Sequence, residues 1–213
     1  MASVLGRTFG HALLLAVSQT SQTKLDDSLA SLVESELLYR RGLAPEVIFE
    51  FKHALVKDAA YQGLLRSKRL KLHKVIAEIV ERDFQQMAEG NPELLAYHYR
   101  EAGEVEKAIP FCFIAGDEAA GRYATAEASA HYQSAFEMAK EISDPDTSAR
   151  SQIKAVLKLA NVIVKRDQLE ANLGNFEYAR KLAEEINHPV RLCQIQYWIG
   201  RSYYVMGRFN LAA

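Results

Sequence analysis

The fold of this chain is decided at FEFKHALVKDAAY, residues 49–61. Its first half alternates aromatic and polar side chains with period two, which is typical of a half-buried strand. From Ala54 onward the apolar residues recur at helical spacing instead. We therefore expect a short strand to end here and a chain of helices to begin. His53 lies at the change of period.

The residues before this stretch predict helices followed by a β-hairpin. Residues 9–19 are apolar enough for a buried helix, and apolar residues recur at helical spacing over 25–37, behind a capping-box pattern at Thr23–Asp26. Two short strands are then expected, one on each side of the turn at residues 43–45. Two or three helices followed by such a hairpin predict a winged-helix-like unit, in which the hairpin is the wing.

The residues after this stretch read as helices. A helix over 54–65 and an apolar stripe over 72–84 are followed by Gly90-Asn91-Pro92, where Asn91 suits an N-cap and Pro92 a first helical position. We place a domain boundary there. The expected domains are residues 1–90, the winged-helix-like unit plus its following helices, and residues 91–213.

Residues 91–213 contain a recurring pattern of small and aromatic residues. Residues 95–108 and 199–212 share its spacing, 174–179 show part of it, and a weaker copy lies in 116–132. The small residues predict close contact between antiparallel helices, and the aromatic residues, including Phe176 and Phe209, are expected to fill the space between hairpins. Glycines are expected at the turns, at positions 103, 174 and 207.

This pattern resembles the tetratricopeptide repeat, a helix-turn-helix unit of about 34 residues. The expected fold is therefore mostly α, with a winged-helix-like N-terminal unit followed by a helical solenoid of such repeats. The last repeat is incomplete at Ala213, and a solenoid normally closes with a polar cap. We therefore expect the chain to belong to a longer protein.

Composition excludes several classes of protein. The net charge is −1, with 49% hydrophobic and 25% charged residues, so no bulk charge attracts nucleic acid or an anionic membrane. The apolar run at residues 12–17 is too short for a signal peptide or a membrane span. Cys112 and Cys193 lie in apolar helical patterns and are expected to be buried free thiols. These features predict a cytoplasmic protein.

The chain lacks the motifs that carry common chemistry. It has no phosphate-binding loop, no dinucleotide fingerprint, no nucleophile elbow and no zinc-protease or C-x-x-C motif. Its six histidines are scattered, without metal-ligand spacing, and the acidic pairs Asp26-Asp27 and Glu184-Glu185 look like solvated helix faces. We therefore expect no catalytic residues, no metal and no cofactor of its own.

One basic cluster has two interpretations. Residues 66–74 contain five Lys or Arg and no acid. They form either a contact for nucleic acid or the solvated face of a helix, with acidic neighbours such as Glu78 and Glu81. The second is favoured because residues 1–90 are nearly balanced in charge, so nucleic acid is not expected as the partner.

Three segments carry a resemblance to a known family. Residues 2–9, 36–42 and 51–61 are similar to the segment that follows the ATPase core in bacterial signal-transduction ATPases of the STAND type. Those proteins are commonly fused to class III adenylate or guanylate cyclases, or to transcriptional regulators, with tetratricopeptide repeats behind. The resemblance implies a non-catalytic segment, an ATPase core as a partner, and ATP or ADP bound by the parent protein.

The resemblance also implies a role for His53. In the related NB-ARC and NACHT ATPases, a Met-His-Asp motif in the winged helix brings a histidine to the β-phosphate of ADP. Residues 52–58 are similar to that motif in His53 and the later Asp58, and depart from it at Ala54. His53 is thus implied to bind the nucleotide phosphate as a sensor. The alternative is structural, with the ring bonded to a carbonyl or to Asp58.

Three functions remain open from the sequence. The leading one is a regulatory segment that reports nucleotide state through the winged helix and binds a protein through the repeat surface. The second is a DNA-binding winged-helix regulator with a repeat-type effector region, although Asp27 and Glu34 make its second helix acidic. The third is a free-standing repeat scaffold.

Overall fold

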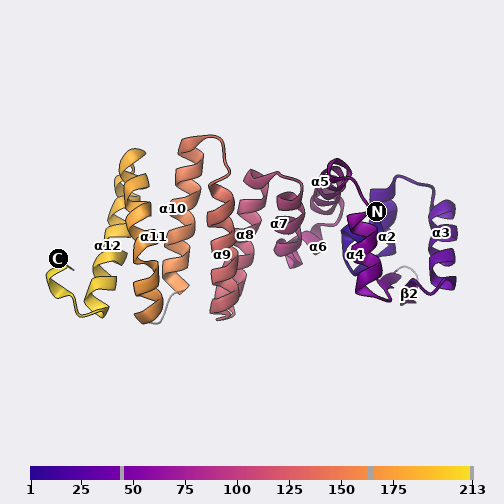
Figure 1. Cartoon of the computed structure of the whole chain (residues 1–213), viewed down its shortest axis with the longest axis horizontal. Coiled ribbons are helices and arrows are strands. Elements are labelled where there is room, and N and C mark those ends of the chain that lie inside the picture. The colour runs from indigo at the N-terminus through magenta and orange to yellow at the C-terminus, as the bar shows by residue number, and fades with distance from the viewer. Residues whose placement is uncertain (44–45, 163–165, 212–213) are drawn as a thin grey trace. The chain divides into compact units, whose positions relative to one another are not determined.

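The protein is mostly helical, as its sequence predicts, and has a small antiparallel sheet near the N-terminus (Figure 1). The computed structural model describes residues 1–43, 46–162 and 166–211. Its elements, in chain order, are α1 (Ala2–Leu5), β1 (Thr8–Gly10), α2 (His11–Ser18), α3 (Gln22–Glu34), β2 (Leu38–Arg41), β3 (Ile48–Phe51), α4 (Ala54–Gln62), α5 (Arg66–Asp83), α6 (Gln85–Gly90), α7 (Pro92–Glu101), α8 (Val105–Gly121), α9 (Thr125–Ala139), α10 (Pro145–Val162), α11 (Arg166–Glu185), α12 (Pro189–Val205) and the 3₁₀ turn η1 (Phe209–Leu211).

The chain divides into two compact units. The first comprises Met1–Gly90 and Tyr97–Glu104, and the second comprises Asn91–Ala96 and Val105–Ala213. Helix α7 therefore contributes residues to both units. Among the described residues, no helix is long and apolar enough to cross a membrane.

The first unit is built around a three-stranded sheet in the order β1-β3-β2. Phe49 of the central strand lies opposite Phe9 of β1 and Arg40 of β2. The predicted alternation of β3 is confirmed, because Phe49 and Phe51 are buried while Ile48 is exposed. The rings of Phe9 and Phe49 stack with their centroids 5.9 Å apart. Aromatic contacts across the strands thus form the core on this face of the sheet.

The predicted helix over residues 9–19 is wrong at its start. Thr8–Gly10 forms β1, and α2 begins only at His11. Phe9 joins the sheet because its partner Phe49 lies far along the chain, and local periodicity does not reveal such a pairing. The predicted hairpin is therefore part of a three-stranded sheet. Ala44 and Pro45 of its predicted turn lie outside the described residues.

The predicted capping box at Thr23 is also wrong. Ser21 occupies the N-cap position of α3 without a side-chain capping hydrogen bond, so Thr23 lies inside the first turn. Asp26 instead pairs with His11 of α2, with 2.6 Å between Oδ1 and Nε2. A contact between two helices thus replaces the local capping interaction that the pattern predicts.

Helices α4 and α5 follow β3, as the change of period predicts. Helix α5 buries Leu72, Ile76 and Val80 of the predicted stripe. Helix α4 differs from the prediction, since it has no buried residue and Leu55 is 81% exposed. Its main neighbours, the short α1 and β3, cover little of its surface. Leu65, expected to continue this helix, is instead the exposed N-cap residue of α5.

In the second unit, helices α8 to α12 stand side by side (Figure 1). Each helix contacts the next one along the chain, and α10 also contacts both α8 and α12. Helices α8, α10 and α12 therefore share one layer, and α9 and α11 form the other. The small and aromatic residues of the pattern are buried at Ala108, Phe176 and Ala179, as predicted.

Glycine is found at two of the three predicted turns. Gly103 follows α7 with φ +80° and Gly207 follows α12 with φ +76°, a conformation that glycine adopts without strain. The prediction for Gly174 is wrong, because it lies in the middle of α11. An interior glycine costs a helix only about 1 kcal/mol. Burial of Phe176 and Ala179 on the same helix outweighs that cost.

The end of the repeat pattern also differs from the prediction. The pattern places Phe209 between two hairpins, yet this residue lies in η1 and is exposed. Its ring contacts Tyr204, which is exposed as well. No described helix covers these two rings. Ala212, which the pattern places at a helix contact, lies outside the described residues.

Helices α8 and α9 approach each other closely at Gly116. A Cβ atom on Gly116 would overlap the ring of Tyr132 on α9. Tyr132 is buried, and its hydroxyl donates a hydrogen bond of 2.6 Å to Asp117, so the ring is held in place. The small residue of the weaker repeat copy is therefore required where these helices meet.

We expect Gly116→Ala to lower the free energy of unfolding of the second unit by about 1–3 kcal/mol, because the added methyl overpacks the helix contact. The matched control is Gly121→Ala on the same helix, where no atom lies within 4 Å of the new methyl. That change should be neutral or stabilising by up to about 1 kcal/mol. Urea unfolding followed through Trp198, the single tryptophan, measures both variants. Equal stability of the two would contradict the close approach.

Candidate functional site

His53, the predicted phosphate sensor, lies at the junction of β3 and α4. It occupies the N-cap position of α4 in extended backbone, makes no side-chain capping hydrogen bond, and is exposed. The carboxylate of Asp58 pairs with Lys57 at 2.9 Å rather than with His53. The structural interpretation through Asp58 is therefore wrong. The imidazole is open to solvent, where a group on another domain or molecule can reach it.

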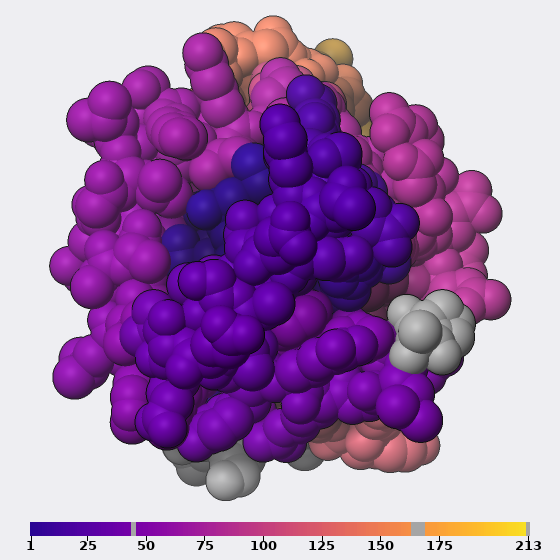
Figure 2. Space-filling view, turned by 90° about the vertical axis from the view of Figure 1, so that its right-hand side faces the viewer, coloured from indigo at the N-terminus to yellow at the C-terminus, as the bar shows by residue number. Residues whose placement is uncertain are grey.

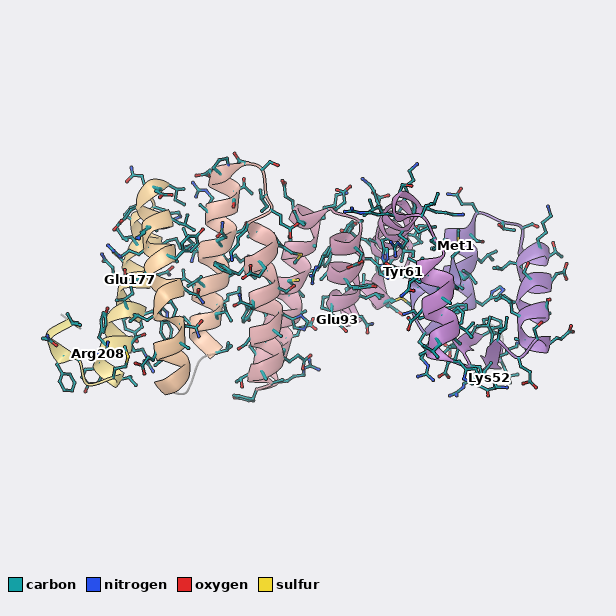
Figure 3. All side chains as sticks on the ribbon, in the orientation of Figure 1. Met1, Lys52, Tyr61, Glu93, Glu177 and Arg208 are labelled. Atoms are coloured by element: carbon teal, nitrogen blue, oxygen red, sulfur yellow. The ribbon has the colours of Figure 1, made fainter. Side chains whose placement is uncertain are left out.

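A fixed cation lies next to His53. The Lys52 ammonium donates a hydrogen bond of 2.6 Å to Glu36, just before β2 (Figure 3). This hydrogen bond raises the pKa of Lys52 and lowers that of Glu36. The ammonium also lies 5.6 Å from the centroid of the Tyr39 ring. The Lys52 charge, one residue before His53 in the sequence, is thus already paired with a carboxylate.

The basic cluster of residues 66–74 is divided between two environments. Arg69 stacks over the Tyr61 ring at 5.1 Å, and Lys74 pairs with Glu104. Arg66, Lys68 and Lys71 are exposed. Glu104 is the main partner of Lys74, and the predicted acidic neighbour Glu78 adds a weaker attraction that also raises the pKa of Lys74.

The surface of α3 is acidic. Helix α3 lies on the face of the first unit that Figure 2 shows, and Asp27 and Glu34 are exposed on it. A cleft of about 800 Å³ beside α3 is lined by the same two acids and Asp26, together with His11 and Arg40. Such a surface repels the phosphates of a nucleic acid more than it attracts them.

A buried pair of histidines joins α5 to α7 in the first unit. The two Nδ1 atoms of His73 and His98 lie 2.9 Å apart, so one ring donates a hydrogen bond to the other. Tyr61 of α4 is labelled in Figure 3. Its hydroxyl lies 3.0 Å from Nε2 of His73. Tyr97 packs edge-on against both imidazoles. We call these four side chains the histidine cluster.

Burial holds the histidine cluster in its neutral form. His73 is 0% and His98 is 1% exposed. Burial, and then the neighbouring His73, lower the pKa of His98 to about 3. Burial also lowers the pKa of His73, against an opposing attraction from Glu101. Since one Nδ1 must accept from the other, both rings cannot be protonated without breaking this hydrogen bond.

The second unit carries a cleft of about 600 Å³ between α10 and α12. We name it the basic–aromatic cleft, and its lining residues are Lys154, Leu157, Lys158, Asn161, Arg191, Cys193, Gln194, Tyr197 and Trp198. Three of these residues are cations and none is an acid. Tyr197 is 60% exposed, and its ring centroid lies 5.6 Å from that of Trp198.

One cation of the cleft already has a carboxylate partner. Lys158 donates to both oxygens of Asp117, at 2.6 and 2.8 Å. Burial disfavours the charged form of Asp117, but hydrogen bonds from Lys158 and Tyr132 outweigh it, so the pKa of Asp117 is lowered. This network ties α8, α9 and α10 together and orients the side chain of Lys158.

The other two cations, Lys154 and Arg191, come from α10 and α12, the two helices that form the cleft. The Lys154 ammonium lies 4.3 Å from the centroid of the Phe113 ring, and Arg191 donates to the amide oxygen of Gln194 at 2.9 Å. No ion pair joins either residue to a carboxylate in the described part of the chain. Burial and then repulsion by Lys158 lower the pKa of Lys154. Attraction to Asp117 opposes this shift, and Arg191 adds a smaller lowering. Asp117 therefore offsets part of the charge of Lys158 and Lys154, and the three cations together leave the cleft with an excess of positive charge.

The same two cations border a second hollow. Lys154 and Arg191 also line a cavity of about 370 Å³, together with Phe113 of α8 and Glu106. These two residues are thus shared by both hollows. Among the residues that the structure describes, no group of three or more His, Cys, Asp or Glu side chains could hold a metal ion.

Neither the histidine cluster nor the cleft is among the sequence predictions. His73 and His98 lie on different helices, and so do Lys154 and Arg191. A usable signal was present for the cleft, because Lys154 and Lys158 share one helix face at i, i+4 spacing. Cys193 corrects another prediction: it is exposed at the cleft, whereas Cys112 is buried as expected. Neither cysteine forms a disulfide bond.

The comparisons with known proteins do not assign a family. No family model matches this chain, and no solved structure matches it. An uncharacterized protein of Rhizobium meliloti (strain 1021) is 27% identical over 185 residues. The match covers 86% of this chain and 18% of that relative. The chain thus spans less than a fifth of the length of the relative that it matches.

Proposed function

We propose that this chain is a non-catalytic regulatory and protein-interaction segment of a larger cytoplasmic signalling ATPase. In this proposal its first unit is a winged-helix-like module that reports nucleotide state, and its second unit is a tetratricopeptide-like surface that binds a protein partner. The nucleotide is bound by the parent protein, and this chain holds no cofactor of its own. The observation that carries the proposal is the basic–aromatic cleft, a hollow lined by three cations, the exposed Tyr197 and the half-buried Trp198.

Interaction surfaces have a recognisable composition, and the cleft fits it. Aromatic residues and arginine are enriched at the centres of protein interfaces. Tyr197, Trp198 and Arg191 supply these side chains on a single helix, α12. The cleft also lies on the layer formed by α8, α10 and α12, so its walls are rigid helices rather than loops. A rigid wall lowers the entropic cost of ordering the surface when a partner binds.

The order of elements supports the winged-helix part of the proposal. Helix α3 is followed by β2 and β3, and β1 closes the sheet on the other side of β3. His53 follows β3 directly and is exposed, which suits a donor that must reach a phosphate on a neighbouring domain. The acidic surface of α3 disfavours the alternative of a DNA-binding regulator.

The nucleotide role is tested by adding this chain to a separately produced ATPase core of the parent protein. We expect the chain to tighten ADP binding by that core. With His53→Ala in the chain, the affinity of the pair for ADP should be about tenfold lower than with the wild-type chain, because one phosphate contact is worth about 1–2 kcal/mol. The matched control is His188→Ala, a histidine of the second unit. Unchanged ADP affinity with His53→Ala would overturn the sensor role. No effect of the chain at all would favour a free-standing scaffold.

The partner-binding role is tested by placing a photo-reactive amino acid at Tyr197, in cells that make the parent protein. A discrete protein adduct is expected at Tyr197. The matched position is Lys181, which is exposed on α11 and lies outside the cleft lining, and it should give no such adduct.

A further inference from the structure

The basic–aromatic cleft restricts the chemistry of what it can bind. Lys154 and Arg191 form no ion pair with a carboxylate among the described residues, and both line two adjoining hollows. Asp117 offsets only part of the charge of Lys154, since repulsion by Lys158 is the larger effect. An anion placed there would replace an unfavourable repulsion between cations with two charge-assisted hydrogen bonds. A neutral or basic ligand would leave that repulsion in place. The cleft therefore selects for negative charge.

The apolar walls add a second requirement. Leu157, Tyr197 and Trp198 line the cleft beside the cations. An aromatic pair of this kind buries a large apolar area at low entropic cost. A simple inorganic anion would leave these rings uncovered. The matching ligand combines carboxylates with at least one apolar side chain.

The charge of the whole unit favours a peptide over a nucleic acid. Residues 91–96 and 105–213 together contain thirteen Lys or Arg and fourteen Asp or Glu, so no broad positive field surrounds the cleft. Asp117 and Glu106 lie close by, on the helix next to α10. A nucleic acid needs a run of cations along its phosphates, whereas a short acidic segment needs only a local pair.

We infer that the basic–aromatic cleft binds an acidic peptide segment of a protein partner. Carboxylates of the segment pair with Lys154 and Arg191, and Arg191 can hold a carboxylate through two parallel hydrogen bonds. An apolar side chain of the segment lies against Tyr197 and Trp198. This inference rests on the proposed function and names the chemistry of the partner at the same surface.

Two residues of the cleft report binding without any engineered probe. Trp198 is the single tryptophan of the chain, so its fluorescence responds to a ligand in the cleft. Cys193 is exposed at the same cleft, whereas the other cysteine is buried. Its alkylation rate therefore measures protection by a bound ligand. The two readouts are independent, because one is optical and the other chemical.

The first experiment titrates the full chain with a capped octapeptide of glutamates and leucines. We expect saturable change in Trp198 fluorescence and slower alkylation of Cys193, with an affinity that falls as salt is raised. The counterpart peptide, with glutamine in place of every glutamate, should bind at least about tenfold more weakly. Equal binding of the two peptides would overturn the inference, and so would a single-stranded oligonucleotide that binds more tightly than the acidic peptide at the same salt.

The second experiment removes the two cations. The double variant Lys154→Gln with Arg191→Gln should bind the acidic peptide about tenfold or more weakly, because it loses two charge-assisted contacts. The matched control is Lys181→Gln with Arg208→Gln, which makes the same change in charge outside the cleft lining. Unchanged affinity in the cleft variant would contradict the inference, provided that its far-ultraviolet circular dichroism matches the wild type.

These outcomes separate the inference from the proposed function. If photo-crosslinking at Tyr197 succeeds but the acidic peptide does not bind, the cleft binds a partner of another chemistry and only the inference fails. If crosslinking fails while the peptide binds as expected, the cleft recognises acidic peptides but the partner-binding role is wrong for the cells tested.

Discussion

Lowering the pH from 7.0 to 5.0 should reduce the free energy of unfolding of the first unit by about 2 kcal/mol through His98 alone. In the folded chain the pKa of His98 is about 3, because the ring is buried and lies beside His73. In the unfolded chain its pKa is about 6.5. Between these values the unfolded chain binds a proton that the folded chain does not. The contribution of His98 to the free energy of unfolding is therefore fully present above about pH 7 and is lost as the pH falls toward 3.

The groups around the histidine cluster set the direction of this effect. Tyr61 faces it from α4, Arg69 from α5, and Tyr97 and Glu101 from α7. Arg69 opposes protonation of His73, while Glu101 favours it. Burial is the largest contribution for both histidines, so both pKa values are lowered. His73 therefore adds to the loss of stability on acidification.

Hydrogen exchange of peptides from α5 and α7 measures this loss locally, because Trp198 reports only on the second unit. His98→Gln should flatten the pH dependence between 7.0 and 5.0, whatever its effect on absolute stability. His53→Gln, a histidine of the same unit that is exposed, should leave the slope as in the wild type. A wild-type slope that persists in His98→Gln would show that other groups cause the acid sensitivity.

Phe176→Ala should lower the free energy of unfolding of the second unit by about 3–5 kcal/mol, the range for removing a buried aromatic ring. Phe176 is 1% exposed on α11, and its ring stacks against Trp198 of α12 at 6.5 Å. The truncation leaves a cavity between the two helices and removes this ring contact. Urea unfolding followed through Trp198 fluorescence gives the value directly.

The control for Phe176 is Tyr204→Ala on α12, an aromatic side chain that is exposed. It should cost less than about 1 kcal/mol, because surface substitutions rarely cost more. Comparable losses in the two variants would mean that Phe176 does not hold α11 against α12. The fluorescence maximum of Trp198 should also shift to longer wavelength in Phe176→Ala, since water reaches the cavity edge.

Much of the helical architecture could be predicted from the sequence, because it depends on local periodicity. The stripe of α5, the alternation of β3 and the turns at Gly103 and Gly207 all follow from spacings within one element. Strand β1 could not be predicted, because its three residues gain strand character only from pairing with β3. The turn predicted at Gly174 was wrong for a related reason. Burial of the apolar residues of α11 outweighs the preference of one glycine for a turn.

The candidate sites were less accessible from sequence than the fold. His53 could be singled out by resemblance, and the structure adds that it is exposed and that Asp58 pairs elsewhere. The histidine cluster needs α5 and α7 to be placed side by side, and the cleft needs α10 and α12 in the same layer. Both are tertiary facts that a spacing rule within one helix cannot supply. Recognising alternate helices as one layer would have brought Lys154 and Arg191 together.

The most direct test of the proposed function is photo-crosslinking from the basic–aromatic cleft of the parent protein. We expect one discrete adduct from a photo-reactive residue at Tyr197 and no such adduct at Lys181 on α11. The adduct should be lost when Lys154 and Arg191 are both changed to glutamine. An adduct of equal yield at Tyr197 and Lys181, or none at Tyr197, would contradict the claim that this surface binds a protein partner.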